Sequence, residues 1–273
     1  MKLSPGLKEY SVSINKHQIH FSCKYQPTST EVVIFFHGLG CSGDSFRNIH
    51  NHDYFLDKSL LVLDHIGFGD SSKSEDFLYT MEDQAQIMEK LLSILPKWNI
   101  HIVAHSMGAA IALFLSTQTF SRVVSFSNIE GNLISEDCGI FSRGISDISF
   151  EEYKNKMHKM HLFAFRGHDQ IHIKQSSPLA IYKSAVSLVE KSDSGELLNK
   201  FKKLNCKKSY FYGEENKSMP VLNKLDFVQK YMIQNSGHGM TTENPKEFYA
   251  KLVEFIDSES VPFGSAQGTA SGC

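Results

Sequence analysis

The segment that most constrains the fold runs from Ile102 to Ala110 and reads IVAHSMGAA. A β-branched apolar run leads into Ser106, and an alanine-rich stretch follows it. Ala104 and Gly108 are very small, as a tight strand-to-helix turn requires, because a larger side chain would collide with the adjacent backbone. The usual pattern is Gly-x-Ser-x-Gly, so Ala104 departs from it by a methyl group. The segment predicts a serine at a helix N-terminus, where negative charge is favoured. The alternative is a buried strand and helix with an incidental serine.

Apolar runs and helical periodicity alternate along the rest of the chain. Two alternating segments at 9–14 and 18–25 predict an antiparallel hairpin. Apolar runs then predict buried strands, at 32–36, 60–63, 100–104 and 123–129. The strand–helix alternation resumes after the middle of the chain, with strands predicted at 208–212 and 228–234. Helical spacing appears at 80–95, 106–116, 219–225 and 245–256, with Thr80 and Asn244 as N-caps. This alternation predicts an α/β fold with a mostly parallel sheet of eight strands.

The middle of the chain differs, because residues 132–205 carry few strand signals. Helical patterns at 150–160, 178–191 and 195–204 predict a helical cap inserted into the sheet domain. The core is then formed by residues 1–131 and 206–258. The last residues, 259–273, are small and lack apolar periodicity, so we expect a disordered or expression-derived tail outside the fold.

Composition excludes several classes of protein. The chain has 273 residues, 41% of them hydrophobic and 21% charged, with a formal net charge of −2. It has no basic tract for nucleic acid, no apolar run that could span a membrane, and no signal-peptide pattern, so we expect a cytoplasmic protein. Its five cysteines form no Cys-x-x-Cys pair, which argues against a zinc site or a redox dithiol, and no cofactor is expected. Composition leaves monomer and homodimer open.

Four features stand at the carboxyl ends of predicted strands, where ligands bind in open α/β sheets. They are the turn from His37 to Gly40, Ser106, Glu130 and His238. With these features the sequence resembles the α/β-hydrolase fold superfamily over nearly its whole length outside the tail. The order nucleophile, acid, histidine is that of the family. The Asp-x-x-Gly-x-Gly-x-Ser stretch at 64–71 matches a loop that recurs among its members.

The resemblance implies a catalytic triad with Ser106 as nucleophile. Serine is a poor nucleophile until a base removes its proton, and His238 is the candidate base placed after the last strand. Gly237 and Gly239 beside it predict a tight loop that carries the imidazole back over the sheet. By the same resemblance, the backbone N–H groups of Leu39 and Met107 form the oxyanion hole.

Two positions of the sequence compete for the third member of the triad, the acid. In many family members the acid follows the seventh strand, a few residues after a glycine, but here that position holds Asn216. Other members place a glutamate after the sixth strand, where this chain has Glu130. A charged residue next to an apolar strand is costly to bury without a partner. We therefore favour Glu130 as the acid, with Glu215 and Glu214 as alternatives.

The serine also narrows the reaction, because dehalogenases and epoxide hydrolases of this family attack with an aspartate. We expect a carboxylesterase acting on small to medium acyl esters. His37, Gly38 and His105 are expected beside the substrate, and Phe141 and Phe163 of the insertion are expected to line an apolar pocket. Alternatives are a thioesterase, a carbon–carbon bond hydrolase, a perhydrolase, or a small-molecule receptor without catalysis.

Two histidine pairs have spacing that suggests metal binding. His168 and His172, with Asp169 between them, could share one helix face. However, the segment lacks the zincin glutamate, and Gly167 makes a helix there doubtful, so we expect polar loop residues and no metal. The pair formed by His50 and His52 is no stronger.

Overall fold

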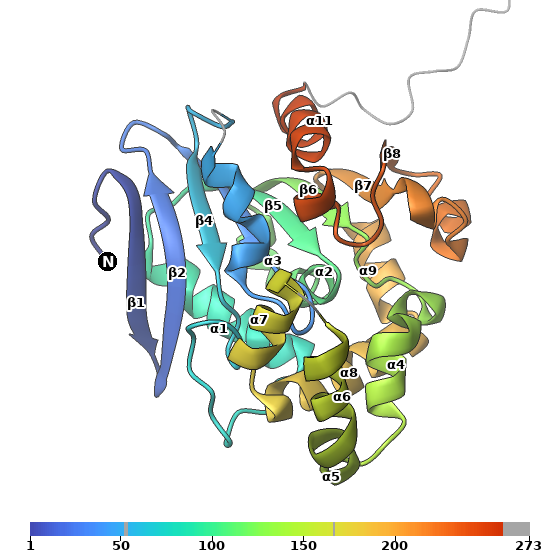
Figure 1. The fold of residues 1–273 in the computed structure, drawn as a ribbon. Helices are drawn as coiled ribbons and strands as arrows, with labels where there is room; N and C mark the ends of the chain where they lie inside the picture. The colour runs from blue at the N-terminus through green and yellow to red at the C-terminus, as the bar shows by residue number, and fades with distance from the viewer. Residues whose placement is uncertain (52–53, 166, 259–273) are drawn as a thin grey trace, which may run out of the picture.

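The computed structural model describes residues 1–51, 54–165 and 167–258, so the predicted tail at 259–273 lies outside the described residues. Eight strands form one sheet in the order β1-β2-β4-β3-β5-β6-β7-β8 (Figure 1). Their bounds are β1 Gly6–Ile14, β2 His17–Tyr25, β3 Glu31–Phe36, β4 Ser59–Leu63, β5 Asn99–His105, β6 Val123–Ile129, β7 Lys207–Gly213 and β8 Gln229–Ile233. The predicted α/β sheet is confirmed.

Most of the sheet is parallel. The hairpin of β1 and β2 is antiparallel, as the sequence predicts, and β2 also pairs antiparallel with β4. From β4 through β3 and β5 to β8 every neighbouring pair is parallel. The carboxyl ends of β3, β5, β6, β7 and β8 therefore meet at one edge of the sheet, which is where ligands bind in this architecture.

Alternate side chains of the central strands enter two separate hydrophobic clusters, one on each face of the sheet. On β3, Ile34 and Phe36 pack into the larger cluster with α1 (Met81–Ile94) and α2 (Met107–Ala112). Val33 and Phe35 pack into the other cluster, with η1 (Gly43–Asn51) and α11 (Pro245–Asp257). Because both faces are covered, the strands are continuous apolar runs rather than alternating ones.

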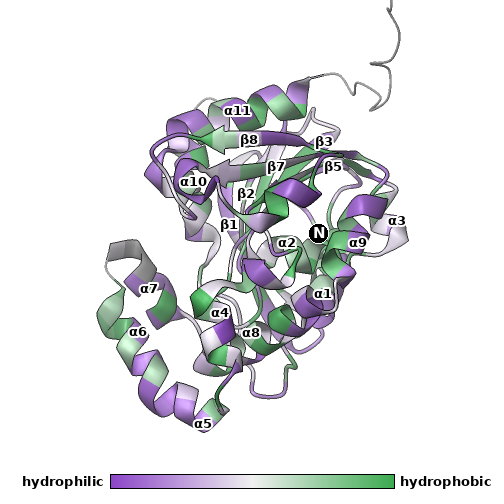
Figure 2. Ribbon diagram, turned by 90° about the vertical axis from the view of Figure 1, so that its right-hand side faces the viewer, coloured by the Kyte–Doolittle hydropathy of each residue, from purple (hydrophilic) through white to green (hydrophobic). Residues whose placement is uncertain are grey.

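The segment between β6 and β7 is helical, as predicted. It contains η2 Ser135–Cys138, α4 Gly139–Ser146, α5 Phe150–Glu152, a π-helical turn at Tyr153–Met157, α6 His158–Ala164, α7 Gly167–Gln175, α8 Pro178–Asp193 and α9 Glu196–Lys203. Its second half packs on the sheet domain. Ser187 of α8 accepts a hydrogen bond from the backbone N–H of Met81, and the Phe201 ring of α9 packs at a tilt of 60° against Phe126 of β6. In Figure 2 α5, α6 and α7 project from the rest of the protein.

Three local predictions need correction. The helix after Ser106 ends at Ala112 and not near residue 116, because Ser116 caps a separate short helix, α3 (Thr117–Phe120). The segment after Gly167 is helical, as α7. Gly167 itself has a φ of 59°, a left-handed conformation that glycine adopts without strain, and so it begins the helix rather than preventing it. The helix predicted at 219–225 is a short 3₁₀ turn, η5 (Pro220–Lys224).

None of the helices within the described ranges combines the length and apolar character that crossing a membrane requires.

Candidate active site

Ser106 lies on a strained turn between β5 and α2. Its φ of 51° and ψ of −123° fall in a region that non-glycine residues rarely occupy and that costs on the order of 1–3 kcal/mol. The small neighbours have a steric reason. A Cβ at Gly108 would lie 2.4 Å from the carbonyl oxygen of Phe36, whereas Ala104 is fully buried and its methyl group is accommodated. The missing first glycine of the pattern therefore leaves the turn intact.

Replacing Gly108 with alanine is expected to lower the free energy of unfolding by about 1–3 kcal/mol, because the added methyl group must displace the backbone of β3. Urea unfolding measures this change. Gly144→Ala is the matched control, since a Cβ there meets only Met157, at 3.9 Å. That helical glycine should gain about 0.5–1 kcal/mol on substitution. Equal effects of the two substitutions would contradict the steric argument.

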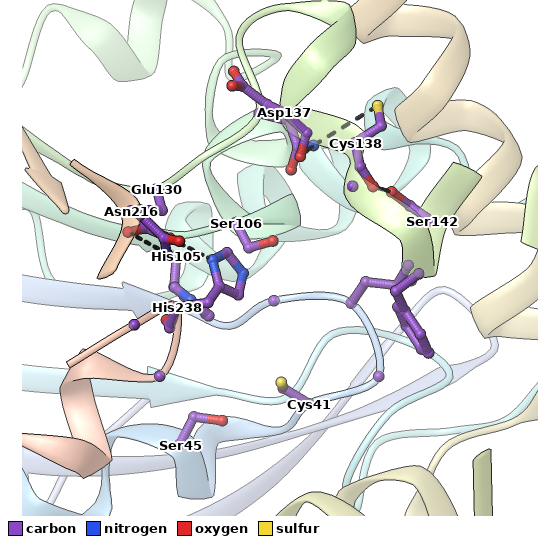
Figure 3. A pocket seen from close by; sticks show the side chains of 18 of the residues that line it. Cys41, Ser45, His105, Ser106, Glu130, Asp137, Cys138, Ser142, Asn216 and His238 are labelled. Atoms are coloured by element: carbon purple, nitrogen blue, oxygen red, sulfur yellow. Dashed lines mark hydrogen bonds and ion pairs between the residues drawn. The ribbon is translucent and has the colours of Figure 1, made fainter. Parts of the chain in front are cut away.

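His238 lies in the loop after β8 and carries its imidazole toward the end of β6. Its Nδ1 donates a hydrogen bond to Oε2 of Glu130 at 2.7 Å (Figure 3). Because an ionised carboxylate only accepts, this contact assigns the proton to Nδ1 and leaves Nε2 free to act as a base. The His238 side chain is 54% exposed and that of Glu130 only 1%. The imidazole is therefore accessible from the cavity, whereas the carboxylate that it contacts is buried. In Figure 3 Ser106 is drawn next to the His238 ring, and both residues line one cavity.

Glu130 follows β6 directly, with a φ of 40°. Besides the His238 contact, its Oε1 accepts the backbone N–H of Gly213 at 2.8 Å. The Asn216 amide donates to both carboxylate oxygens, at 3.0 and 2.9 Å. A buried carboxylate is costly unless it is hydrogen-bonded, and here three different groups donate to it. Asn216, at the position where many family members carry the acid, thus holds the glutamate that contacts the histidine.

The two alternative acids make different contacts. Oε2 of Glu214 accepts the backbone N–H of Asn235 at 3.0 Å. Glu215 lines the cavity near Gly237, where its Oε2 lies 2.8 Å from the place a Cβ would occupy. Across the described part of the chain, neither carboxylate hydrogen-bonds to the His238 ring. The structure also records no hydrogen bond there between the Ser106 hydroxyl and His238, a contact that is often long before substrate binds.

Removing the Asn216 amide should weaken the Glu130–His238 pair. Asn216→Ala deletes two of the hydrogen bonds that hold the carboxylate, and a bond to a charged group contributes about 1.5–3 kcal/mol. We expect kcat to fall about 10- to 100-fold on an activated ester, with KM nearly unchanged. Asn216→Gln keeps an amide of different reach and should lose less. Full activity of the alanine variant would show that the amide is dispensable.

Leu39 and Met107, the residues expected to donate to an oxyanion, both lie close to Ser106 along the chain or across the cavity. Met107 is the first residue of α2, so its N–H has no intrahelical partner. Leu39 lines the cavity directly after Gly38, whose missing Cβ would lie 3.2 Å from Cβ of Ser106. The two segments therefore approach the nucleophile from different strands, and the assignment of Leu39 and Met107 as oxyanion donors stays a prediction.

The cavity above Ser106 has a volume of about 770 Å³, within the range typical of small-molecule sites. Of the expected substrate contacts, Gly38, His105 and Phe141 line it. His37 does not. It is fully buried below the loop, where its Nε2 accepts the N–H of His65. Phe163 does not line it either, because its side chain on α6 is 77% exposed.

Several lining residues were not foreseen, chiefly because they come from separate segments of the chain. They are Asn132, Asp137, Cys138, His172, Ile173, Leu188 and Met219. His172 is buried, and its Nδ1 shares a 2.9 Å hydrogen bond with the Ser42 hydroxyl, which ties α7 to the loop after β3. The side chains of His168 and Asp169 lie outside the described residues, so that pairing is untested.

The charged groups around the cavity are acidic. Glu136, Asp137, Glu215 and Glu243 line it together with Glu130, and no lysine or arginine is among the described residues that do so. Burial raises the pKa of Asp137 to about 6. An anionic ligand would meet repulsion here without a compensating cation.

One group of described residues has the spacing of metal ligands. Atoms of His20, Asp64 and Asp70 lie within 4.8 Å of one another. None of the three lines the cavity. Both oxygens of Asp64 already accept backbone N–H groups, from Gly43 and from Asp70. Asp64 therefore fixes the backbone of two loops through these hydrogen bonds, and we assign no ion to the group.

Comparison with known proteins agrees with this fold. Residues 31–137 match the family described as the alpha/beta hydrolase fold. The match covers the stretch from β3 past Glu130, and the sheet order continues the architecture to the C-terminal helix. The chain thus has the α/β-hydrolase fold, and its residues 31–137 resemble that family in sequence.

Particular relatives and structures can be named. The "Probable lysophospholipase BODYGUARD 4" of Arabidopsis thaliana is 34% identical over 119 residues, 39% of this chain and 28% of that protein. The "Uncharacterized hydrolase YugF" of Bacillus subtilis is 24% identical over 253 residues, 85% of this chain and 92% of that protein. The chain therefore spans only about a quarter of the first relative.

Among solved structures, an esterase from Exiguobacterium antarcticum superposes with a TM-score of 0.73 at 17% identity, over 93% of this chain and 100% of that one. The Cif epoxide hydrolase from Acinetobacter nosocomialis gives 0.75 at 16%, over 93% and 90%. Since proteins of different activity superpose equally well, these likenesses show the fold alone.

Proposed function

We propose that this protein is a serine hydrolase that cleaves a carboxylic ester through an acyl-enzyme, with Ser106, His238 and Glu130 as its triad. The observation that carries the proposal is the 2.7 Å hydrogen bond from His238 to a buried Glu130, on the wall of the cavity that Ser106 also lines. A carboxylate that orients an imidazole beside a strained serine is the arrangement that activates a hydroxyl as nucleophile. The resemblance to a protein named a probable lysophospholipase supports a hydrolase.

The reaction would proceed in two halves. Nε2 of His238 takes the proton of Ser106 while Oγ attacks the carbonyl carbon, and the developing oxyanion accepts hydrogen bonds from the N–H groups of Leu39 and Met107. As the carbon–oxygen bond breaks, the leaving alcohol takes the proton from His238. Water then attacks the acyl-enzyme by the same steps and releases the acid. Glu130 stays ionised and stabilises the imidazolium in each half.

The cavity supports a neutral substrate of moderate size. Its volume of about 770 Å³ accommodates a small to medium acyl chain, with Phe141, Phe165, Ile173 and Leu188 on its wall. The surrounding carboxylates disfavour an ester that carries a negative charge near the scissile bond. Serine in place of the aspartate used by epoxide hydrolases of this family argues for attack on a carbonyl rather than on an epoxide.

Fluorophosphonate labelling tests the proposal directly. The purified protein should be modified at Ser106, as peptide mass spectrometry would show, and His238→Ala should abolish the reaction. A panel of neutral aryl esters with acyl chains of increasing length should then be hydrolysed, with a matched carboxylate-bearing ester turned over much more slowly. Absence of labelling together with inactivity on the whole panel would favour the receptor interpretation instead.

A further inference from the structure

His105 is the residue before the nucleophile, and it contacts the loop that carries the base. Its side chain leaves the end of β5, and the residue is only 6% exposed. Its Nε2 lies 2.9 Å from the backbone carbonyl oxygen of His238. Because a carbonyl oxygen can only accept, Nε2 must carry the proton. The hydrogen bond thus ties the loop of the proposed base to the strand of the proposed nucleophile.

The two imidazole rings also touch. Their centroids are 4.5 Å apart and their planes are inclined by 44°. Burial lowers the pKa of His105 to about 3, so this ring stays neutral near neutral pH. A neutral ring packs against the imidazolium that forms on His238 during catalysis, whereas a charged one would repel it.

The opposite edge of the His105 ring is confined as well. Its Nδ1 lies 3.0 Å from the position that a Cβ would take at Gly38, the residue before the proposed oxyanion donor Leu39. This buried nitrogen has no hydrogen-bond partner within the part of the chain that the structure describes. The ring therefore fills the space between the Gly38 turn and the His238 loop. Neither segment can move toward the other without displacing it.

We propose that His105 is a positioning residue that sets the His238 imidazole relative to Ser106. This inference rests on the proposed function, because it concerns the same site. His105 does not touch the reacting atoms. It acts by holding the carbonyl of His238 through Nε2. The charged or titratable groups around His238 are Glu130 from β6, His105 from β5, and Glu215 and Glu243 on the cavity wall.

Two substitutions separate the hydrogen bond from simple packing. His105→Phe keeps a ring and removes the donor, while His105→Gln offers an N–H at comparable reach and removes the ring. We expect the phenylalanine variant to lose about tenfold in kcat and in the rate of fluorophosphonate labelling, with KM unchanged, since a neutral hydrogen bond contributes about 0.5–1.5 kcal/mol. The glutamine variant should recover most of that loss.

The matched control is His101→Gln, on the same strand. His101 is also a buried histidine, 2% exposed, and it bonds to the Ser125 hydroxyl away from the cavity. This variant reports the general cost of replacing a buried histidine of β5. Its melting temperature should fall while its labelling rate stays at the wild-type value.

Proton NMR gives a readout that lost stability would not imitate. The proton on Nδ1 of His238, shared with Glu130, should give a downfield resonance that disappears in Glu130→Gln. We expect it to be sharp in the wild type and in His105→Gln, and broadened by solvent exchange in His105→Phe. If His105→Phe does not fold, His105→Met removes the donor with a more adaptable side chain.

The outcomes for the two proposals differ. Wild-type protein that resists fluorophosphonate contradicts the proposed function. Wild-type protein that reacts at Ser106, with both His105 variants reacting equally fast and keeping a sharp resonance, overturns the positioning role and leaves the hydrolase intact. Loss in the glutamine and phenylalanine variants alike would assign the effect to ring packing and would likewise overturn the hydrogen-bonding role.

Discussion

Glu130→Gln is expected to lower kcat on an activated ester by about 10⁴-fold, the largest effect of any substitution that leaves the nucleophile and the base in place. The amide can still reach Nδ1 of His238, now 2.7 Å from Oε2 of Glu130. However, it cannot stabilise the imidazolium that forms, and it can bind the ring in the wrong tautomer. Steady-state kinetics with a neutral aryl ester would measure the loss, and KM should change little.

The control for this prediction is Glu214→Gln, which removes a carboxylate of the neighbouring loop that bonds to Asn235. That variant should keep nearly wild-type kcat. Thermal unfolding of both variants separates loss of catalysis from loss of fold. The assignment of the acid would be wrong if Glu130→Gln stayed active while Glu215→Gln lost activity.

Ser106→Gly should be inactive and, at the same time, more stable than the wild type. Glycine adopts the φ of 51° without the penalty that a side chain incurs, so we expect a gain of about 1 kcal/mol in the free energy of unfolding. Activity should fall to the residual level left by the oxyanion hole and binding alone, a loss of at least about 10⁴-fold. Kinetics and urea unfolding on the same preparation test both parts.

Ser106→Ala provides the comparison, because it removes the hydroxyl but keeps a Cβ in the same backbone conformation. It should be as inactive as Ser106→Gly and show none of the gain in stability. An equal stability of all three proteins would mean that the turn relaxes after substitution, and that the serine is not held against backbone strain.

The sheet and the strand-to-helix turn at Ser106 could be predicted from sequence because both depend on local patterns. The strand at 123–129 is found with the predicted bounds, and Thr80 and Asn244 cap their helices as expected. Continuous apolar runs report burial on two faces, and small residues beside Ser106 report a crowded turn. Each of these patterns lies within a few neighbouring residues, so it can be recognised without knowing which distant residues pack against it.

The cavity-facing residues of the insertion were harder to predict, because its apolar side chains have several different neighbours to pack against. Phe163 looked like a cavity residue by its type, yet α6 turns it outward, while Phe165 two residues later reaches the cavity. Local sequence reports that a residue is apolar. It does not report which of several helices that residue will face, since neighbouring helices decide this together.

By itself, then, the sequence determined the order of strands and helices, the serine on its turn, and the histidine after the last strand. Only the tertiary structure shows which of the candidate acids contacts the histidine. Glu130 and Glu215 follow adjacent parallel strands, and both come near the loop of His238. The direction of each side chain determines which carboxylate reaches the His238 ring. Gly213 and Asn216, more than eighty residues along the chain from Glu130, donate the hydrogen bonds that hold its buried carboxylate against the histidine.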